Sequence, residues 1–236
     1  MLNPPEDQTI VFSLFTKTPG LKDKELARRL ITIILSYQNS FSPQLIDYGK
    51  GWNSVKSDFS NVYSNWGTTP TLLLKREKDI SCEMVINFEN LPPNFSNLML
   101  WIEESYFEEE VHIQRFLQMS LEIYDLLHPY YGSIHQTQDA IKMLSRLTNL
   151  GKTTLGLNLQ KGIPGVYWAN FFGLEFVTKY ESKQLMLAPC KYRKELNDGG
   201  ILLITSGSPL NPSSDSSVKM RHQIRDYIGE DAFFPI

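Results

Sequence analysis

Two short stretches of the chain contain residue types that can bind phosphate or assist hydrolysis. The first, Gly151-Lys152-Thr153-Thr154, resembles the end of a P-loop, where a lysine and a hydroxyl group contact nucleotide phosphates. A complete P-loop also has a glycine five residues earlier, and this chain has Arg146 there, inside an expected helix. We therefore expect no nucleotide site, and Gly151 is better explained as the residue that ends the helix.

The second stretch, Glu181-Ser182-Lys183, places a carboxylate two residues from a lysine. A metal-dependent nuclease needs such groups together with further carboxylates that hold the metal ion. The nearest aspartate upstream is Asp139, on the far side of the segment 162–173. A metal-dependent hydrolase or nuclease that uses Glu181 and Lys183 therefore stays as the alternative function.

The histidines and cysteines are the remaining residues that could do chemistry. They are His112, His128, His135, His222, Cys82 and Cys190. No histidines pair at i, i+4, and the cysteines form no C-x-x-C, so a zinc site is not expected. There is no G-x-S-x-G nucleophile motif either. We predict no catalytic residue, no metal ligand and no cofactor, and we expect the protein to bind a partner rather than to be an enzyme.

Five glutamates lie close together around the start of the longest expected helix. They are Glu103, Glu104, Glu108, Glu109 and Glu110. Acidic side chains at a helix N-terminus complement the helix dipole, so a solvated helix start would account for them. The same charges could instead form a negative surface that faces a basic partner and speeds association with it. These five glutamates are the candidate partner-binding surface.

The Gly162–Gly173 segment, GIPGVYWANFFG, is the most distinctive part of the chain. Pro164-Gly165 predicts a turn, and Asn170 is expected to cap a short helix that carries Phe172 and Phe176. The segment places four large rings within six residues, at Tyr167, Trp168, Phe171 and Phe172. Aromatic clusters are usually core, but Trp and Tyr also anchor protein interfaces, and the residues alone leave both interpretations open.

Strands and helices are expected to alternate along the chain. β-branched and aromatic residues predict strands over Thr9–Thr16, Thr71–Arg76, Cys82–Phe88, Asn97–Glu103, Tyr130–His135, Lys183–Leu187 and Ile201–Thr205. Apolar residues at helical spacing predict helices over Lys24–Tyr37, Glu108–Leu127, Gln138–Leu147 and Ser217–Ile228.

Several connections can also be assigned. Asp23 is expected to cap the first helix, and Asn90–Asn94 to turn between two antiparallel strands. In the last helix the inward positions are Met220, Ile224, Tyr227 and Ile228. Asn39–Thr69 is expected to be irregular surface with Trp52 and Trp66 as anchors, and its function is open.

Composition limits the fold class and the partners. The 236 residues are 42% hydrophobic and carry a net charge of −3, which is typical of a globular domain with a substantial core. We predict one α+β domain over 1–236, with a largely antiparallel sheet packed against several helices. The chain has no basic stripe, so direct nucleic-acid binding is not expected. Without a signal peptide or an apolar run near ~20 residues, we expect a cytoplasmic protein that contacts no membrane.

The segment that begins at Gly162 resembles the immunity protein 52 family of bacterial polymorphic-toxin systems, and is similar to related type VI immunity proteins. The resemblance rests on a proline turn, a Trp-x-Asn stretch, Phe-Gly, and then a glutamate and an aromatic residue. These positions are Pro164, Trp168, Asn170, Phe172, Gly173, Glu175 and Phe176. Leu174 departs from the proline expected at its position, and the loss should be tolerated in a first helical turn. The match covers roughly the second half of the chain.

The resemblance implies a cytoplasmic immunity protein, encoded beside a toxin, that neutralises this toxin by binding it. In this family the cognate toxin is often a restriction-endonuclease-like nuclease. A nuclease cleft is basic because it holds phosphates, and the five glutamates could occupy or flank it. A third hypothesis is that the protein is a non-enzymatic adaptor that has no cognate toxin. The oligomeric state is open.

Overall fold

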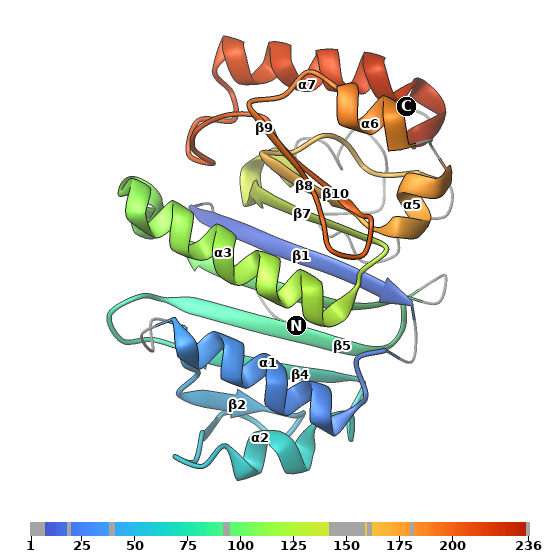
Figure 1. The fold of residues 1–236 in the computed structure, drawn as a ribbon. Coiled ribbons are helices and arrows are strands. Elements are labelled where there is room, and N and C mark those ends of the chain that lie inside the picture. Colours follow the sequence, from blue (N-terminus) through green and yellow to red (C-terminus); the bar gives the residue numbers. More distant parts are fainter. Residues whose placement is uncertain are drawn as a thin grey trace.

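One antiparallel sheet forms the middle of the molecule (Figure 1). The structure is a computed structural model that describes residues 8–17, 20–37, 41–91, 95–141, 159, 162–179 and 182–234. Within these residues ten strands join in the order β3-β2-β4-β5-β6-β1-β7-β8-β10-β9. Their bounds are β1 Thr9–Lys17, β2 Leu45–Asp47, β3 Asn53–Ser54, β4 Thr71–Arg76, β5 Cys82–Leu91, β6 Phe95–Glu103, β7 Tyr131–Gln136, β8 Ala169–Phe172, β9 Tyr192–Glu195 and β10 Ile201–Ile204.

The first strand lies in the centre of this sheet. β1 pairs with β6 along its whole length, and with β7 from Ile10 to Phe15. Its first eight residues are buried. Side chains alternate between the two faces of a strand, so β1 has to be apolar on both faces. It therefore joins the N-terminal and C-terminal halves of the sheet.

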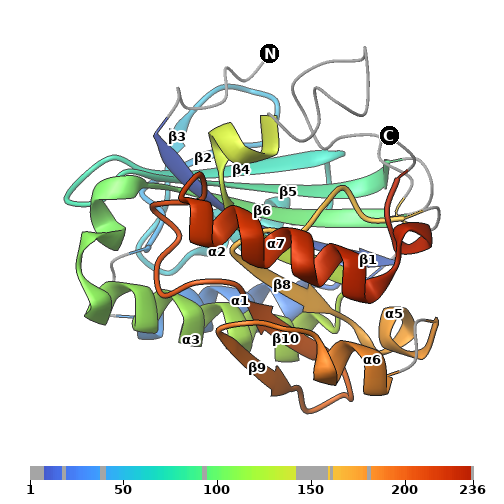
Figure 2. The same cartoon turned by 90° about the horizontal axis from the view of Figure 1, so that it is seen from above.

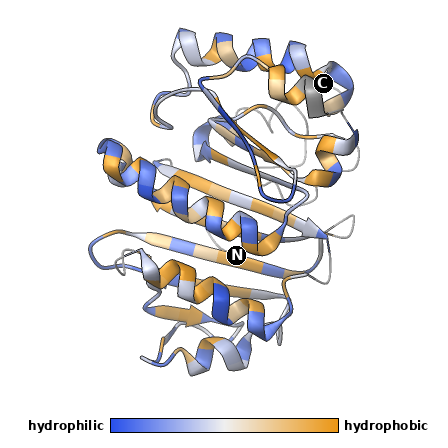
Figure 3. Cartoon of the chain, in the orientation of Figure 1, coloured by the Kyte–Doolittle hydropathy of each residue, from blue (hydrophilic) through white to orange (hydrophobic). Residues whose placement is uncertain are grey.

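Two long helices cover one face of the sheet (Figures 1 and 2). They are α1 Lys24–Ser36 and α3 Glu110–Leu127. Asp23 caps α1 as predicted, because its carboxylate accepts the backbone N–H of Glu25 at 2.9 Å. Both helices show apolar and polar stripes in Figure 3. Their apolar stripes meet Ile10, Phe12 and other inward residues of the strands in the larger of two cores.

Two short helices and one long helix cover the other face around the C-terminal strands. They are α5 Leu174–Lys179, α6 Ser182–Leu187 and α7 Asp215–Ile228. The second core includes Phe15, Tyr131, Phe172 and Leu203, together with Ile224 of α7. The strands β7, β8 and β10 therefore contribute residues to both cores, which explains their largely apolar character.

The hairpin expected around Asn90–Asn94 is confirmed, since β5 and β6 pair antiparallel on either side of it. Met84, Ile86 and Phe88 face the larger core as their alternation predicts. The last helix begins two residues earlier than predicted, with Ser214 as its N-cap. Tyr227, expected to point inward, is 39% exposed. Arg221 is buried in this helix, so the inward stripe is partly polar.

One predicted strand was wrong, and several short elements were not predicted. Lys183–Leu187, expected as a strand, belongs to helix α6. The described part of Asn39–Thr69 is mainly irregular as predicted, but it also contains β2, β3 and the helix α2 Ser60–Asn65. The exposed strand β9 was not predicted. These elements are two to six residues long, so hydrophobic periodicity has too few positions to reveal them.

The fold class is confirmed as α+β, in a single compact domain. A 3-10 turn, Glu104–Glu108, precedes α3, and another, Glu230–Ala232, follows α7. Among the described residues no helix is both long enough and apolar enough to cross a membrane. The predicted helix Gln138–Leu147 starts at Thr137, and its residues from 142 onward lie outside the described residues.

Candidate functional site

The Gly162–Gly173 segment is buried from end to end, including Pro164. Ile163 forms a parallel bridge to Phe233, which ties the start of the segment to the C-terminal part of the chain. The segment ends as β8, between β7 and β10. Its aromatic residues are therefore core residues, which settles the choice that the residues alone left open.

Asn170 does not cap a helix. It lies within β8, fully buried, and its amide makes two 3.0 Å hydrogen bonds to the backbone of Tyr167. The side-chain oxygen accepts the N–H, and the side-chain amide donates to the carbonyl oxygen. These bonds satisfy backbone groups that the irregular stretch before β8 leaves unpaired. Asn170 thus closes the turn that leads into β8. In the sequence, an Asn with this role looks the same as an Asn that caps a helix.

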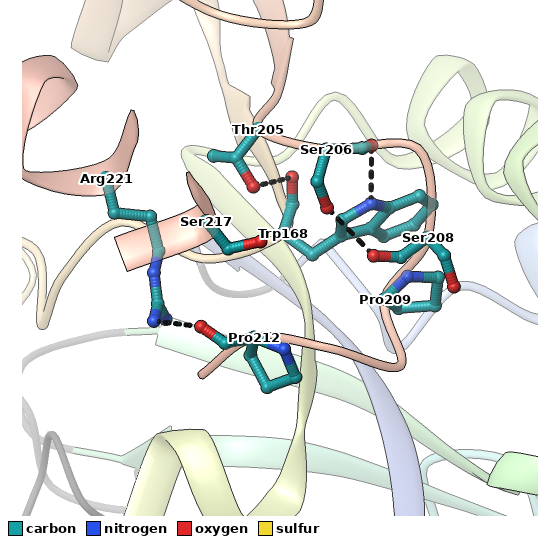
Figure 4. A pocket seen from close by; sticks show the side chains of 8 residues that line it. All are labelled: Trp168, Thr205, Ser206, Ser208, Pro209, Pro212, Ser217 and Arg221. Atoms are coloured by element: carbon teal, nitrogen blue, oxygen red, sulfur yellow. Dashed lines mark hydrogen bonds between the residues drawn. The ribbon is translucent and has the colours of Figure 1, made fainter. Parts of the chain in front are cut away.

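Trp168 is 5% exposed and belongs to the larger core. Its indole N–H donates to the carbonyl oxygen of Ser206 at 2.9 Å (Figure 4). Its own carbonyl oxygen accepts hydrogen bonds from the backbone N–H and the hydroxyl of Thr205. The ring therefore fastens the loop after β10 to the sheet.

Gly173 allows a close approach that no larger residue permits. A Cβ at this position would overlap the carbonyl oxygen of Pro129. The Gly173 N–H donates to the carbonyl oxygen of Tyr130 at 3.1 Å, and the Tyr130 N–H donates to Phe15 at 2.8 Å. The corner after α3 and the end of β8 are thus pressed together beside β1.

The last motif positions divide between core and surface. Phe172 stacks on Phe176, with ring centroids 5.0 Å apart, and both rings are buried. Glu175 is exposed and forms a 2.6 Å ion pair with Lys17. Leu174, which replaces the expected proline, is 52% exposed. Leu174 and Glu175 line a cavity of about 430 Å³ whose wall also includes His128 and Asp198.

A buried polar cluster lies next to this segment. Ser133 and His135, two residues apart on β7, make a 3.2 Å hydrogen bond, and the His135 ring packs on Tyr167 with centroids 4.5 Å apart. The Tyr167 hydroxyl has no hydrogen-bond partner among the described residues. Burial lowers the pKa of His135 from 6.5 to about 3, so its imidazole is neutral near pH 7.

A buried ion pair joins α7 to this region. The Arg221 guanidinium contacts the Asp139 carboxylate, and it also donates to the carbonyl oxygen of Pro212 at 2.6 Å. Trp168, Arg221 and the 206–212 loop enclose a pocket of about 10 Å³ (Figure 4). That volume accepts a water molecule at most, so the pocket is a packing feature and not a ligand site.

The five candidate glutamates are not equivalent. Glu108, Glu109 and Glu110 are exposed, where the 3-10 turn passes into α3. Glu103 ends β6 and Glu104 begins the turn, and both are half-buried. Partial burial raises the pKa of Glu104, although a hydrogen bond with Gln136 opposes the shift. Only the Glu108–Glu110 part presents fully solvated charge.

His112, His128 and the two cysteines lie in surroundings that suit a structural role. His112 bonds to the carbonyl oxygen of Tyr106 at 2.9 Å, while His128 ends α3 with a left-handed φ of 42°. Both cysteines are free, and burial raises the pKa of the Cys82 thiol to about 12. A thiol with that pKa is protonated near pH 7 and is a poor nucleophile.

The remaining sequence candidates fall largely outside the described residues. This holds for Gly151-Lys152-Thr153-Thr154, for Glu181 and for the side chain of Lys183. Among the described residues, no three His, Cys, Asp or Glu side chains lie close enough together to hold a metal ion.

Comparison with known proteins adds a likeness in fold. No protein-family model and no curated protein sequence matches the chain. Among solved structures, the chain is similar to the Pseudomonas aeruginosa T6SS protein PA0821, with a TM-score of 0.67 and 13% sequence identity. The alignment covers 99% of this chain and 77% of that chain. At this identity the likeness concerns the fold.

Sequence reasoning missed the Asp139–Arg221 pair and the buried cluster around His135. The pair joins residues 82 positions apart, so no local pattern signals it. Ser133 and His135 carry a weak signal, because polar residues at i, i+2 in a strand share one face. The loop between β2 and β3 lies in the region Asn39–Thr69, for which the sequence predicts irregular surface, so no pattern singles the loop out.

We predict that Gly173→Ala destabilises the protein by at least ~2 kcal/mol, because the new methyl group must displace the Pro129 backbone. Urea unfolding measures the change. Gly207→Ala is the matched control, since nothing lies within 4 Å of its Cβ position. Equal stability of the two variants would contradict the close approach.

We predict that Trp168→Ala lowers the free energy of unfolding by about 3 kcal/mol, because it leaves a cavity in the core. Trp52→Ala, at a tryptophan that is 41% exposed, should change stability by less than ~0.5 kcal/mol. Thermal and urea unfolding of both variants test the contrast. An unchanged melting temperature for Trp168→Ala would show that this ring is not a core residue.

We predict a pH dependence of stability caused by His135. Its pKa is lower in the folded state than in the unfolded chain, so the unfolded state binds a proton first as the pH falls. Stability from this group is complete above pH 6.5 and falls by up to about 1.4 kcal/mol per unit between pH 6.5 and 3. The free energy of unfolding, measured with urea between pH 7.5 and 5, should depend less steeply on pH for His135→Gln than for the wild type. An equal pH dependence of the two proteins would refute the assignment.

Proposed function

We propose that the protein is an immunity protein that binds and neutralises a cognate toxin of a type VI secretion (T6SS) system. The observation that carries the proposal is the fold likeness to a T6SS protein over 99% of the chain. The resemblance of the Gly162–Gly173 segment to immunity protein 52 sequences supports the same proposal from the sequence. The toxin would be the product of a neighbouring gene, and the complex would form in the cytoplasm.

The proposed action is binding and not catalysis. The side chains that most resemble a nucleophile and a base, Ser133 and His135, are 2% and 3% exposed. A substrate cannot reach them in this state, and the lowered pKa makes His135 a weak base near pH 7. The Cys82 thiol is buried as well. These groups support the fold and leave inhibition by surface contact as the mechanism that we propose.

The exposed Glu108, Glu109 and Glu110 are the part of the candidate surface that suits a basic toxin. Glu110 begins the 18-residue helix α3, Glu109 is its N-cap, and Glu108 ends the preceding 3-10 turn. A nuclease that cleaves nucleic acid has a positive cleft, so complementary charge would steer the encounter. A standard interface buries ~1,600 Å² in total, so three side chains would supply only part of it.

Co-expression with the product of the adjacent gene is the direct test of function. The proposal requires a stable stoichiometric complex and survival of cells that express the toxin. An enzyme that removes the toxin's product would protect without forming a complex. Toxicity that persists despite soluble protein, together with no complex, would refute the proposal.

We predict that reversing Glu108, Glu109 and Glu110 to lysine weakens the complex at least tenfold, mainly through a slower association rate. The melting temperature should change little, because all three side chains are exposed. The matched control reverses three exposed acids elsewhere, Glu89, Glu195 and Asp226.

Surface plasmon resonance at 50 and 300 mM salt separates the outcomes. The wild-type affinity should fall with salt more steeply than that of the Glu108–Glu110 variant, because screening weakens only charge that contributes to binding. Equal affinity for the wild type and this variant would exclude Glu108–Glu110 from the interface.

A further inference from the structure

The loop between β2 and β3, Tyr48–Trp52, is held rigidly by one carboxylate. Asp47 Oδ1 accepts the backbone N–H groups of Gly49, Lys50 and Gly51 at 2.8, 3.1 and 3.0 Å. The Asn53 side chain donates to the carbonyl oxygen of Gly51 at 2.7 Å. Four hydrogen bonds therefore fix a turn of five residues.

The two glycines of the loop serve its conformation. Gly49 and Gly51 have φ values of 89° and 87°, which a residue with a Cβ adopts only with strain. Nothing lies within 4 Å of a Cβ at either position, so neither glycine is needed for close packing. At these two positions the backbone faces solvent, so its conformation is not imposed by contact with a neighbouring element.

The loop presents aromatic and cationic groups outward. Trp52 is 41% exposed, whereas Trp66 of the same region is 1% exposed and donates its indole N–H to Leu21. Lys75 Nζ lies 5.9 Å from the centroid of the Trp52 ring, and Lys50 Nζ lies 5.7 Å from that of Tyr48. The Tyr48 ring is half-buried and packs against the larger core, whereas the cation–π contact with Lys75 leaves part of the Trp52 ring uncovered.

The charged side chain within the Tyr48–Trp52 loop is a lysine, Lys50. The Asp47 carboxylate is occupied by backbone N–H groups, and Glu77 pairs with Lys75 at 2.8 Å. Lys50 is exposed, and its ammonium group is the charge that the loop offers to solvent. A partner that covers Trp52 would therefore place negative groups near Lys50.

We propose that the Tyr48–Trp52 loop is a binding anchor that docks on an acidic surface of the partner protein. The inference deepens the proposed function, on which it rests, by assigning a second contact surface. Tryptophan and tyrosine are favoured at the energetic centres of protein interfaces. A loop fixed before binding loses little conformational entropy when the partner arrives, so more of the contact energy appears as affinity.

A protein fits this surface better than a nucleic acid does. Single-stranded nucleic acid also stacks on exposed Trp and Tyr, but it needs a cationic groove that follows its backbone. Here the outward charge is one lysine on a chain with a net charge of −3. The experiment below nevertheless distinguishes the two ligands.

The test measures the affinity of single variants for the product of the adjacent gene. Trp52→Ala should raise the dissociation constant about 30-fold and leave the melting temperature unchanged. Tyr192→Ala is the matched control, because it removes an aromatic side chain, 49% exposed, from the opposite edge strand. Its affinity should stay within twofold of the wild type.

Two further variants test rigidity and charge. Asp47→Ala should weaken binding about tenfold, whereas Asp47→Asn, which keeps an acceptor oxygen for the three N–H groups, should restore most of the affinity. Lys50→Glu should weaken binding and reduce its dependence on salt if the facing surface is acidic. Circular dichroism confirms that each variant is folded.

The outcomes separate the inference from the proposed function. A wild-type complex that Trp52→Ala leaves within threefold of its affinity would overturn the inference and leave the immunity function standing. Absence of any wild-type complex would overturn both. Binding of a 20-nucleotide thymidine strand that Trp52→Ala abolishes, with toxin affinity unchanged, would assign the loop to nucleic acid and overturn the inference.

Discussion

The structure depends on β1 being buried on both faces and paired on both edges. Ile10, Phe12 and Leu14 enter the core beneath α1 and α3, while Phe15 enters the core on the other side. The neighbouring strands β6 and β7 belong to different halves of the chain. Neither half completes its sheet without this strand, and its pairing with β7 spans more than a hundred residues. Such long-range pairing makes the two halves one cooperative unit and favours slow folding.

The Gly162–Gly173 segment completes the second of these halves. Its glycine at 173 lets the end of β8 meet the corner at Pro129, and Trp168 fastens the loop that leads into α7. A sequence stretch under so many packing constraints tolerates few substitutions, because any larger side chain meets backbone or core. A buried stretch of this kind can therefore keep its sequence for packing reasons alone. In the complex that we propose, contact with the toxin falls to residues outside the segment.

Long elements could be predicted from the sequence because their patterns repeat over many positions. The 13-residue α1, with Asp23 as its cap, and the β5–β6 hairpin are of this kind. Short elements such as α6 could not, since six residues give apolar periodicity too few turns to distinguish helix from strand. The Asp139–Arg221 pair depends on tertiary placement alone. The candidate glutamates can be recognised in the sequence as a run of acidic residues. The Tyr48–Trp52 loop cannot, because its fixed conformation depends on contacts between the Asp47 carboxylate and backbone N–H groups, which only the structure shows.

The two proposed contact surfaces would contribute to different parts of binding. The exposed glutamates at the start of α3 are solvated and act at a distance, so their influence falls mainly on the rate of encounter. The Tyr48–Trp52 loop offers little long-range field but a large ring on a fixed backbone, so its influence falls mainly on the lifetime of the complex. The loop adjoins β3 at one edge of the sheet, and the glutamates follow β6, four strands inward from β3 along the order β3-β2-β4-β5-β6. A partner that engages both needs a basic and an acidic area on one surface, and that requirement makes recognition selective, because a partner with only one of these areas loses either speed or lifetime.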